Sequence, residues 1–205
     1  MILPVAATSL GGAKVLGAPV QDADPAAAML RGTRLHLLLE YLPGASRDDW
    51  PALARAALTG TEGGLPDRNE FLSLMDEARA VIDAPDLSGV MAPPPDAQIL
   101  REVRLTATVP GIGLLHGTID RLILRAQEVL AIDYKSNAEL PDRPDGTPLG
   151  ILRQMGAYRA ALREIYPDRI MRMAILWTAA PGLMELPDSL LDQVMAALDP
   201  RGPHP

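Results

Sequence analysis

Residues 132–137 have the sequence Ile-Asp-Tyr-Lys-Ser-Asn and close an apolar run that begins at Val129. This run predicts a strand, and on a strand alternate side chains share a face. Asp133 and Lys135 are therefore expected to point to one side of a sheet and Tyr134 to the other. A carboxylate and an ammonium at a strand end suit either a simple salt bridge or a site that holds a metal ion and water, and this stretch alone does not choose between them.

A second carboxylate lies on the preceding predicted strand. Asp120 stands in the middle of that strand, where aspartate is disfavoured and is costly if buried without a partner. A two-residue turn predicts an antiparallel strand pair that places Asp120 opposite or near Asp133. Two adjacent carboxylates repel each other, and a divalent cation relieves that repulsion. The alternative is an ion pair of Asp120 with Arg121 or with Lys135.

The order of the predicted elements indicates an α+β domain. Apolar periodicity and turn residues predict helices over residues 26–42, 49–60, 69–82, 150–166 and 187–198. They predict strands over 102–109, 114–124, 128–134 and 171–178, with a short extension over 183–186. A three-strand meander followed by a helix and a further strand is typical of a mixed sheet flanked by helices. In the third helix we expect an inward face made of Phe71, Leu72, Leu74, Met75 and Ala78.

Glycine and proline residues divide the chain into parts. Residues 1–25 contain several of both and predict a flexible lead-in or linker. Residues 26–200 are expected to form one folded domain, with an N-terminal helical part over 26–95 and a sheet core with flanking helices over 100–198. The run of three prolines at 93–95 separates these two parts.

Composition excludes several classes of protein. The 205 residues contain no cysteine, which excludes disulfides, thiolate zinc sites and iron–sulfur clusters. A metal would have to bind carboxylates, histidine, carbonyls or water, which suits Mg²⁺ with Mn²⁺ as a substitute. No apolar run is long enough to span a membrane and the N-terminus lacks the pattern of a signal peptide, so a cytoplasmic location is expected. The sequence contains no phosphate-binding G-x-x-x-x-G-K-[ST] segment, so we expect no ATP site.

The net charge of −7 is unusual for a protein that binds nucleic acid by itself. Either the domain does not bind nucleic acid, or a larger assembly delivers the strand to it. The sequence has only two lysines, Lys14 and Lys135, so the position of Lys135 is the more informative.

Taken together, these motifs resemble a known family. Asp120, Asp133 and Lys135 resemble the D…(D/E)-x-K core of the PD-(D/E)XK nuclease superfamily, whose restriction-endonuclease-like fold is a mixed central sheet flanked by helices. The segment from Gly32 to Glu40, with His36 and Leu39, resembles the G-x-x-x-H-x-x-L-E helix of the RecB-like branch. Gln154 and Tyr158 resemble its Q-x-x-x-Y helix. Within that branch the chain is most similar to the C-terminal nuclease domains of AddA-type helicase–nucleases of alphaproteobacterial form, over about residues 26–198.

The resemblance implies a role for each matching residue. Asp120, Asp133 and Lys135 would be catalytic, and the metal ligands would be His36, Asp120, Asp133 and the Tyr134 carbonyl. Gln154 and Tyr158 would contact the DNA strand or support the site, and Glu102 would be a supporting carboxylate.

Each of these residues also has a structural explanation. His36 could be a packed helix residue, Gln154 and Tyr158 could be the polar edge of an amphipathic helix, and Glu102 could pair with Arg104. Glu40 could hydrogen-bond His36 or face solvent. His116 and His204 match no motif and are treated as incidental.

The resemblance also implies a function and partners. The domain would hydrolyse phosphodiesters of single-stranded DNA from an unwound end, as an exonuclease within a helicase–nuclease complex that acts in double-strand break repair and recombination. Its partners would be the DNA, the helicase portion of the same polypeptide and an AddB-like subunit, with no membrane. The alternative is an inactive nuclease-fold module that acts in DNA binding or subunit assembly. Two departures matter: Ile119 replaces the nominal proline before the first aspartate, and the missing cysteines exclude relatives that carry an iron–sulfur cluster.

Overall fold

The computed structural model describes residues 5–11, 24–136 and 140–198. Much of the predicted lead-in over residues 1–25 therefore lies outside the described residues, and the proposed division into domains stays a prediction. Within that lead-in, Val5–Ala6 form strand β1 and Ala7–Ser9 form a short 3-10 helix, with Ala7 buried against the sheet. The described helices contain no segment both long and apolar enough to cross a membrane.

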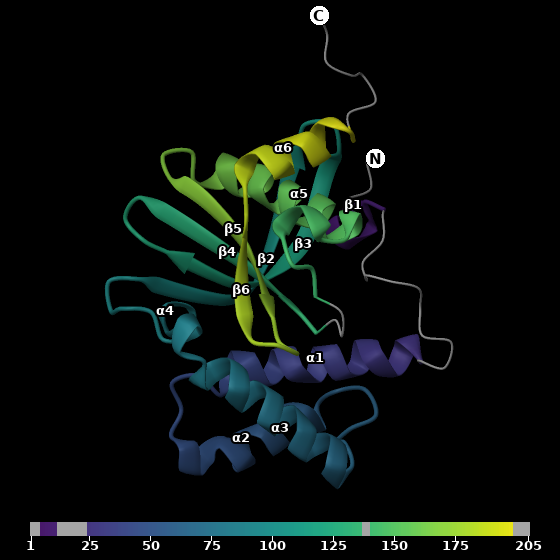
Figure 1. Cartoon of the computed structure of the whole chain (residues 1–205), viewed down its shortest axis with the longest axis vertical. Helices are drawn as coiled ribbons and strands as arrows, with labels where there is room; N and C mark the ends of the chain where they lie inside the picture. Colours follow the sequence, from purple (N-terminus) through teal and green to yellow (C-terminus); the bar gives the residue numbers. More distant parts are fainter. Residues whose placement is uncertain (1–4, 12–23, 137–139, 199–205) are drawn as a thin grey trace, which may run out of the picture.

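Six strands form one mixed sheet (Figure 1). Its path is β1 (Val5–Ala6), β3 (Gly113–Leu124), β4 (Glu128–Lys135), β5 (Ile170–Trp177) and β6 (Gly182–Leu186), while β2 (Gln98–Val109) also pairs with β3. The β1–β3 and β4–β5 pairs are parallel, and the β2–β3, β3–β4 and β5–β6 pairs are antiparallel. The predicted α+β class with a mixed sheet is confirmed.

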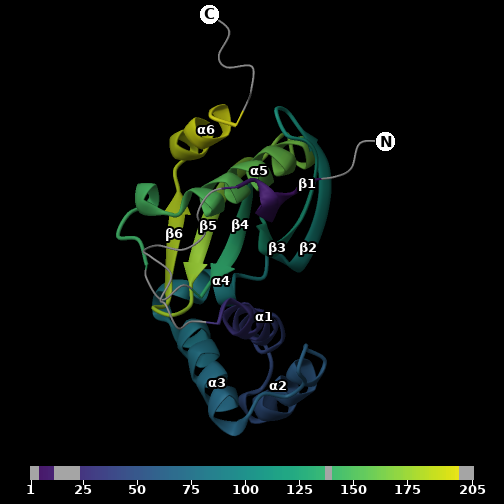
Figure 2. The same cartoon turned by 90° about the vertical axis from the view of Figure 1, so that its right-hand side faces the viewer.

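Helices flank this sheet on both sides. They are α1 (Pro25–Tyr41), α2 (Trp50–Thr59), α3 (Arg68–Asp83), α4 (Ser88–Met91), α5 (Leu149–Ile165) and α6 (Asp188–Ala196). Figures 1 and 2 both show α1, α2 and α3 grouped beyond one end of the strands, with α5 and α6 on the far side of the molecule. Each helix and strand that the sequence predicts is present, with ends shifted by at most four residues. The sequence pattern missed β1, α4 and the short 3-10 helices.

The sheet separates two hydrophobic cores. On one face, Val129 and Ala131 of β4 pack in a core shared with α5 and α6. On the other face, Leu130, Ile132 and Tyr134 pack in a core shared with α1 to α4. Strand β4 is therefore buried on both faces, which explains its nearly continuous apolar sequence. Asp133, which lies inside this strand, is therefore buried although it can carry a charge.

The helical part is held together by polar contacts as well as by its core. Arg34 of α1 is buried and donates hydrogen bonds to Glu70 on α3 and to the Gly64 carbonyl. Glu77 of α3 accepts a 2.6 Å hydrogen bond from Thr178, which directly follows β5, and it forms a 2.7 Å ion pair with Arg31. These contacts fix α1 and α3 to each other and to the end of the sheet.

The inward face of α3 differs from the expectation at one residue. Leu74, Met75 and Ala78 are buried as predicted, and Val81 joins them. Leu72, however, is 49% exposed, so its predicted inward position is wrong. At about 100° per residue, Leu72 and Leu74 are some 200° apart around the helix, and they cannot both face one core.

We predict that Leu74→Ala destabilises the protein by about 2–5 kcal/mol, because it removes buried contacts and leaves a cavity. The matched control is Leu72→Ala on the same helix, which should cost less than about 0.5 kcal/mol. Urea unfolding followed by circular dichroism measures both. Equal costs for the two substitutions would contradict the described packing of α3.

Candidate active site

Three adjacent strands place one carboxylate each at the same level of the sheet. The β3–β4 pairs end at Arg121 opposite Ile132, so one step further the same register sets Asp120 opposite Asp133. On the other side of β3, the flanking pairs Arg101–Arg121 and Val103–Ile119 set Glu102 opposite Asp120. The expected convergence of Asp120 and Asp133 is therefore confirmed, and Glu102 extends the row.

The site lies where β3 changes its neighbour. Along one edge, Leu115 and His116 of β3 pair with β1, whereas residues 121–124 pair with β4. Between these two segments the edge has no paired strand among the described residues. Asp120 Oδ2 occupies this opening and accepts a 2.5 Å hydrogen bond from the Tyr134 backbone N–H. Its carboxylate thus replaces the strand partner that β4 lacks at this point.

Helix α1 contributes the histidine of the site. His36 Nδ1 lies 3.3 Å from Asp120 Oδ1, and the His36 ring makes an edge contact with the Tyr134 ring at 5.4 Å between centroids. Burial lowers the pKa of His36, but the charge and hydrogen bond of Asp120 outweigh it, so the pKa is raised. In either protonation state, His36 contacts Asp120 in the site. Packing of α1 alone therefore does not explain this histidine. Glu40 makes no described hydrogen bond to His36.

Glu102 lies closer to the centre of the site than the sequence suggested. One ligand atom each from His36, Glu102 and Asp120 lies within 4.8 Å of the others. Burial and the negative charge of Asp120 raise the pKa of Glu102. The described residues give it no ion pair with Arg104, the alternative partner considered above. The backbone of Glu102 has a φ of +48° in the middle of a strand, a conformation that costs of order 1–3 kcal/mol and is concentrated at functional sites.

Asp133 and Lys135 form an ion pair on the same face of β4. Asp133 is only 2% exposed, and burial raises its pKa, an effect that Lys135 only partly offsets. Burial also lowers the pKa of Lys135, but the charge and hydrogen bond of Asp133 outweigh this and raise it. Lys135 is therefore an ammonium at neutral pH. Neither Arg121 nor Lys135 forms a described ion pair with Asp120.

Helix α5 supplies the polar residues behind this pair. Gln154 Nε2 donates a 3.2 Å hydrogen bond to Asp133 Oδ1 and lies 3.3 Å from the Tyr158 hydroxyl. The Tyr158 hydroxyl in turn donates to the Thr118 carbonyl at 2.8 Å. Both side chains are buried, so they are not a solvent-facing polar edge. They connect α5 to Asp133 and to the open edge of β3.

Gly117 makes room for this connection. A Cβ at Gly117 would lie 2.5 Å from Cε1 and 2.7 Å from the hydroxyl oxygen of Tyr158, well inside contact distance. The glycine three residues before Asp120 therefore allows the Tyr158 ring to lie directly against β3.

These residues surround a cavity of about 360 Å³. Its lining also includes His116 of β3 and Ala6, Ala7 and Thr8 of the N-terminal segment. His116 was treated as incidental in the sequence, and the N-terminal segment was expected to be a lead-in. Both therefore border the site without having carried a motif.

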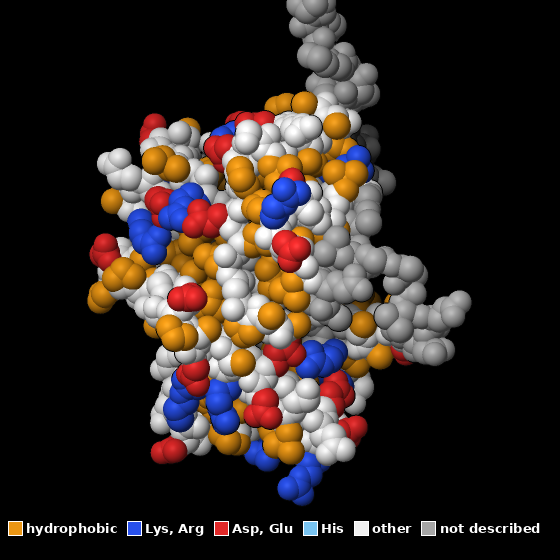
Figure 3. All heavy atoms as spheres, viewed as in Figure 1, with side chains coloured by type: hydrophobic (Ala, Val, Ile, Leu, Met, Phe, Trp, Pro, Cys, Tyr) orange, Lys and Arg blue, Asp and Glu red, His pale blue; other side chains and the backbone are white. Residues whose placement is uncertain are grey.

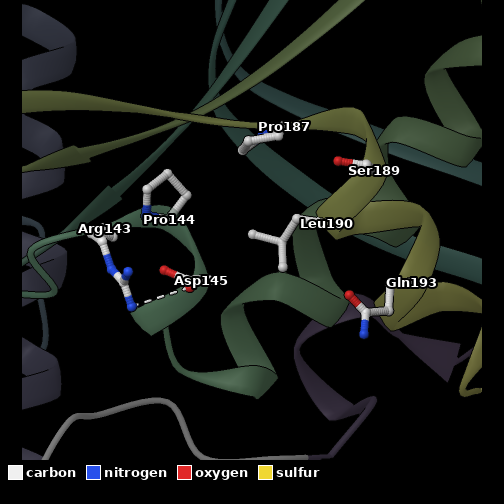
Figure 4. A pocket seen from close by; sticks show the side chains of 7 residues that line it. All are labelled: Arg143, Pro144, Asp145, Pro187, Ser189, Leu190 and Gln193. Atoms are coloured by element: carbon white, nitrogen blue, oxygen red, sulfur yellow. Dashed lines mark ion pairs between the residues drawn. The ribbon is translucent and has the colours of Figure 1, made fainter.

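A second hollow of about 390 Å³ lies between residues 143–145 and the start of α6 (Figure 4). Its one carboxylate, Asp145, forms a 3.3 Å ion pair with Arg143, and Pro187 and Gln193 line the opposite side. This hollow does not gather the groups that hydrolytic chemistry requires. The first cavity is the candidate site.

Comparison with known proteins agrees with this geometry. A family model described as the PD-(D/E)XK nuclease superfamily matches residues 10–185, and the chain therefore belongs to that superfamily. Its members are nucleases and typically use a divalent metal. No curated protein matches the chain. A solved structure titled "Crystal structure of SSO0001" aligns with 95% of this chain and 74% of its own at 11% identity and a TM-score of 0.34, a likeness that supports no conclusion about this chain.

The structure brings together all the residues that the motifs singled out. His36, Asp120, Asp133, Lys135, Gln154 and Tyr158 line one cavity. A carboxylate oxygen of Glu102 lies within 4.8 Å of a potential ligand atom of His36 and of Asp120. The Tyr134 side chain packs in the core on the α1 side, where its ring contacts His36, and its backbone N–H donates to Asp120; the described contacts do not include its carbonyl. The individual roles given to these residues stay predictions.

We predict that Gly117→Ala destabilises the protein by about 1–3 kcal/mol, because the new methyl group displaces the Tyr158 ring. The same substitution in a Tyr158→Ala background should cost much less, since the space is then free. A double-mutant cycle from urea unfolding measures this coupling. Equal costs in the two backgrounds would show that Tyr158 does not explain the glycine.

Proposed function

We propose that this chain is a metal-dependent DNA nuclease domain of the RecB-like branch, similar to the nuclease domain of AddA-type helicase–nucleases. The observation that carries the proposal is the alignment of Glu102, Asp120 and Asp133 across three strands, with His36 and Lys135 beside them. The order of the motifs along the chain supports the assignment to this branch.

The donor set suits a hard divalent cation such as Mg²⁺ or Mn²⁺. Carboxylate oxygens and an imidazole nitrogen are ligands that these ions accept. The raised pKa values of Glu102 and Asp133 show that the site disfavours its own negative charges. His36, Glu102 and Asp120 would hold the ion, with Asp133 and the Tyr134 carbonyl as further ligands from β4. A bound ion would supply an acidified water and polarise the phosphate.

The protein's own groups would perform the remaining tasks. The Lys135 ammonium lines the cavity beside Asp133, where it would stabilise negative charge that develops on the phosphate. Gln154 would keep Asp133 oriented through its hydrogen bond to Oδ1. Tyr158 would hold the open edge of β3 in place through the Thr118 carbonyl. None of these roles requires a covalent intermediate.

The charge of the chain favours delivery of the DNA by other parts of an assembly. On the face shown in Figure 3, acidic and basic side chains of the described residues are interspersed, and no continuous basic surface is visible there. With a net charge of −7, the domain has little long-range attraction for a polyanion. A helicase motor and an AddB-like partner that supply single strands from a broken end would account for this. In that setting the domain would act as an exonuclease in repair and recombination.

The alternative is an inactive nuclease-fold module that serves DNA binding or subunit assembly. It would be favoured by the loss of one of the central groups. Asp120, Asp133 and Lys135 are all present and converge on one cavity, which supports the active form.

We predict that Mn²⁺ raises the thermal midpoint of the protein. At ten times its dissociation constant, an ion that binds only the folded state contributes about 1.4 kcal/mol, which corresponds to roughly 3–6 °C for a chain of this size. Asp120→Ala should abolish the shift, whereas Asp145→Ala at the second hollow should retain it. Differential scanning fluorimetry against MnCl₂ gives the measurement. A full shift in Asp120→Ala would place the metal site elsewhere.

We further predict metal-dependent cleavage of single-stranded DNA at low salt, abolished by EDTA. Lys135→Ala should lower the rate by about 10²–10³-fold, because a cation at the developing charge is lost. Lys14→Ala makes the same change in charge at the only other lysine of the sequence and should leave the rate within about twofold. A gel assay with an end-labelled oligonucleotide reports the rates. Unchanged cutting by Lys135→Ala would exclude the role given to this lysine.

A further inference from the structure

Arg121 is a fully buried arginine on the opposite face of β3 from Asp120. Its guanidinium makes no described ion pair with a carboxylate, although a buried charge without a partner is strongly unfavourable. Instead, Nε donates a 2.7 Å hydrogen bond to the Tyr134 hydroxyl, Nη1 donates to the Val90 carbonyl at 2.9 Å, and Nη2 donates to the Leu39 carbonyl at 3.4 Å. A 3.5 Å contact to the Met91 carbonyl completes the set.

The three carbonyls share a feature that the sequence explains. In a helix each carbonyl normally accepts from the N–H four residues later, and proline has no N–H. Four residues after Leu39, Val90 and Met91 the chain has proline in every case, at 43, 94 and 95. The ends of α1 and α4 therefore carry carbonyls that the helix itself cannot satisfy. Their partial negative charge is the kind that a buried cation can use in place of a carboxylate.

This contact joins the two elements on which the site depends. Leu39 lies three residues after His36 on α1, and Arg121 directly follows Asp120 on β3. Because a helix is stiff over one turn, a contact that fixes the Leu39 carbonyl to β3 also fixes where His36 stands relative to Asp120. The Tyr134 hydroxyl adds β4 to the same anchor, next to Asp133 in the chain.

We infer that Arg121 is a positioning residue. It bonds the carbonyls of α1 and α4 that proline leaves without a helical N–H partner, and it thereby sets the geometry of His36 and Asp120 in the metal site. The expected effect of Arg121 on metal binding rests on the proposed function. The structural part of the inference, the placement of α1 against β3, does not depend on a metal.

The test compares Mn²⁺ binding in two variants. Arg121→Met keeps an unbranched apolar side chain in place of the arginine stem and loses the charge, whereas Arg121→Lys keeps the charge but loses the planar fork of donors. Arg121→Met should weaken Mn²⁺ binding by about tenfold, the order found when a group that orients a metal ligand is lost. Arg121→Lys should weaken Mn²⁺ binding less than Arg121→Met does, because its ammonium can still bond part of the set of acceptors. The free Mn²⁺ signal in electron paramagnetic resonance titrations gives the dissociation constants.

Two controls separate positioning from general destabilisation. Arg159→Met removes another buried arginine, which pairs with Asp188 and Asp192 on the far side of the molecule, and should leave the Mn²⁺ dissociation constant unchanged. In a His36→Ala background, Arg121→Met should weaken binding by less than about twofold more, since the ligand that it positions is already gone. Full additivity of the two substitutions, or unchanged Mn²⁺ binding in folded Arg121→Met, would overturn the inference.

A metal-free measurement keeps the inference distinct from the proposed function. The His36 and Tyr134 rings make an edge contact at 5.4 Å, which should give nuclear Overhauser effects between their protons. We expect these to be lost in Arg121→Met and retained in Arg159→Met. Their retention in Arg121→Met would overturn the inference. If the wild-type protein bound no Mn²⁺, the proposed function would fail, and this measurement would still decide whether Arg121 positions α1.

Discussion

The site depends on the point at which β3 leaves one neighbouring strand and takes up another. Between His116, the last residue paired with β1, and Arg121, the first paired with β4, the edge of β3 has no partner strand within the described part of the chain. An unsatisfied strand edge inside a protein is costly, so side chains must bond it. Tyr158 bonds the β3 backbone by donating to the Thr118 carbonyl, and the Asp120 side chain bonds the facing edge of β4 by accepting the Tyr134 N–H. The residues of β3 beside this opening, from His116 to Thr118 together with Asp120, line the cavity.

Closing the edge with carboxylates creates an electrostatic problem at the same place. Glu102, Asp120 and Asp133 stand side by side on adjacent strands, and like charges at that spacing repel. Lys135 relieves only part of this, because its ammonium pairs with Asp133. The metal-free protein therefore holds an arrangement that its own charges oppose. Such a row of carboxylates, two of them with raised pKa values, is the pattern found at functional sites.

The sequence predicts those parts of the site that depend on a pattern within one strand or two adjacent strands. Strands 128–134 and 114–124 have clear apolar patterns and a two-residue turn, so the register that joins Asp120 to Asp133 was predictable. The position of Glu102 was not, because on an exposed edge strand a glutamate next to arginines is unremarkable, and its φ of +48° has no signature in sequence. Residues 6–8 border the cavity from a two-residue strand and a short 3-10 helix, which are too short to give a periodic signal, and His116 lies on β3 outside any motif. The position of Leu72 was predicted wrongly because four apolar residues close together in the sequence, at 71, 72, 74 and 75, were all assigned inward, although a helix buries only one face.

The helical part belongs to the site rather than beside it. His36 stands on α1, whose buried face lies in the core that also holds Tyr134 and Ile132 of β4, while Gln154 and Tyr158 belong to the core on the other face. The cavity is thus bordered by groups from both cores, and neither layer alone can form it. Because Asp120 contacts His36 on one side and the Tyr134 N–H on the other, a shift of α1 against the sheet would be felt at the carboxylate itself. A fragment limited to the sheet and α5 would keep Asp120, Asp133 and Lys135 and lose His36, the imidazole that contacts Asp120.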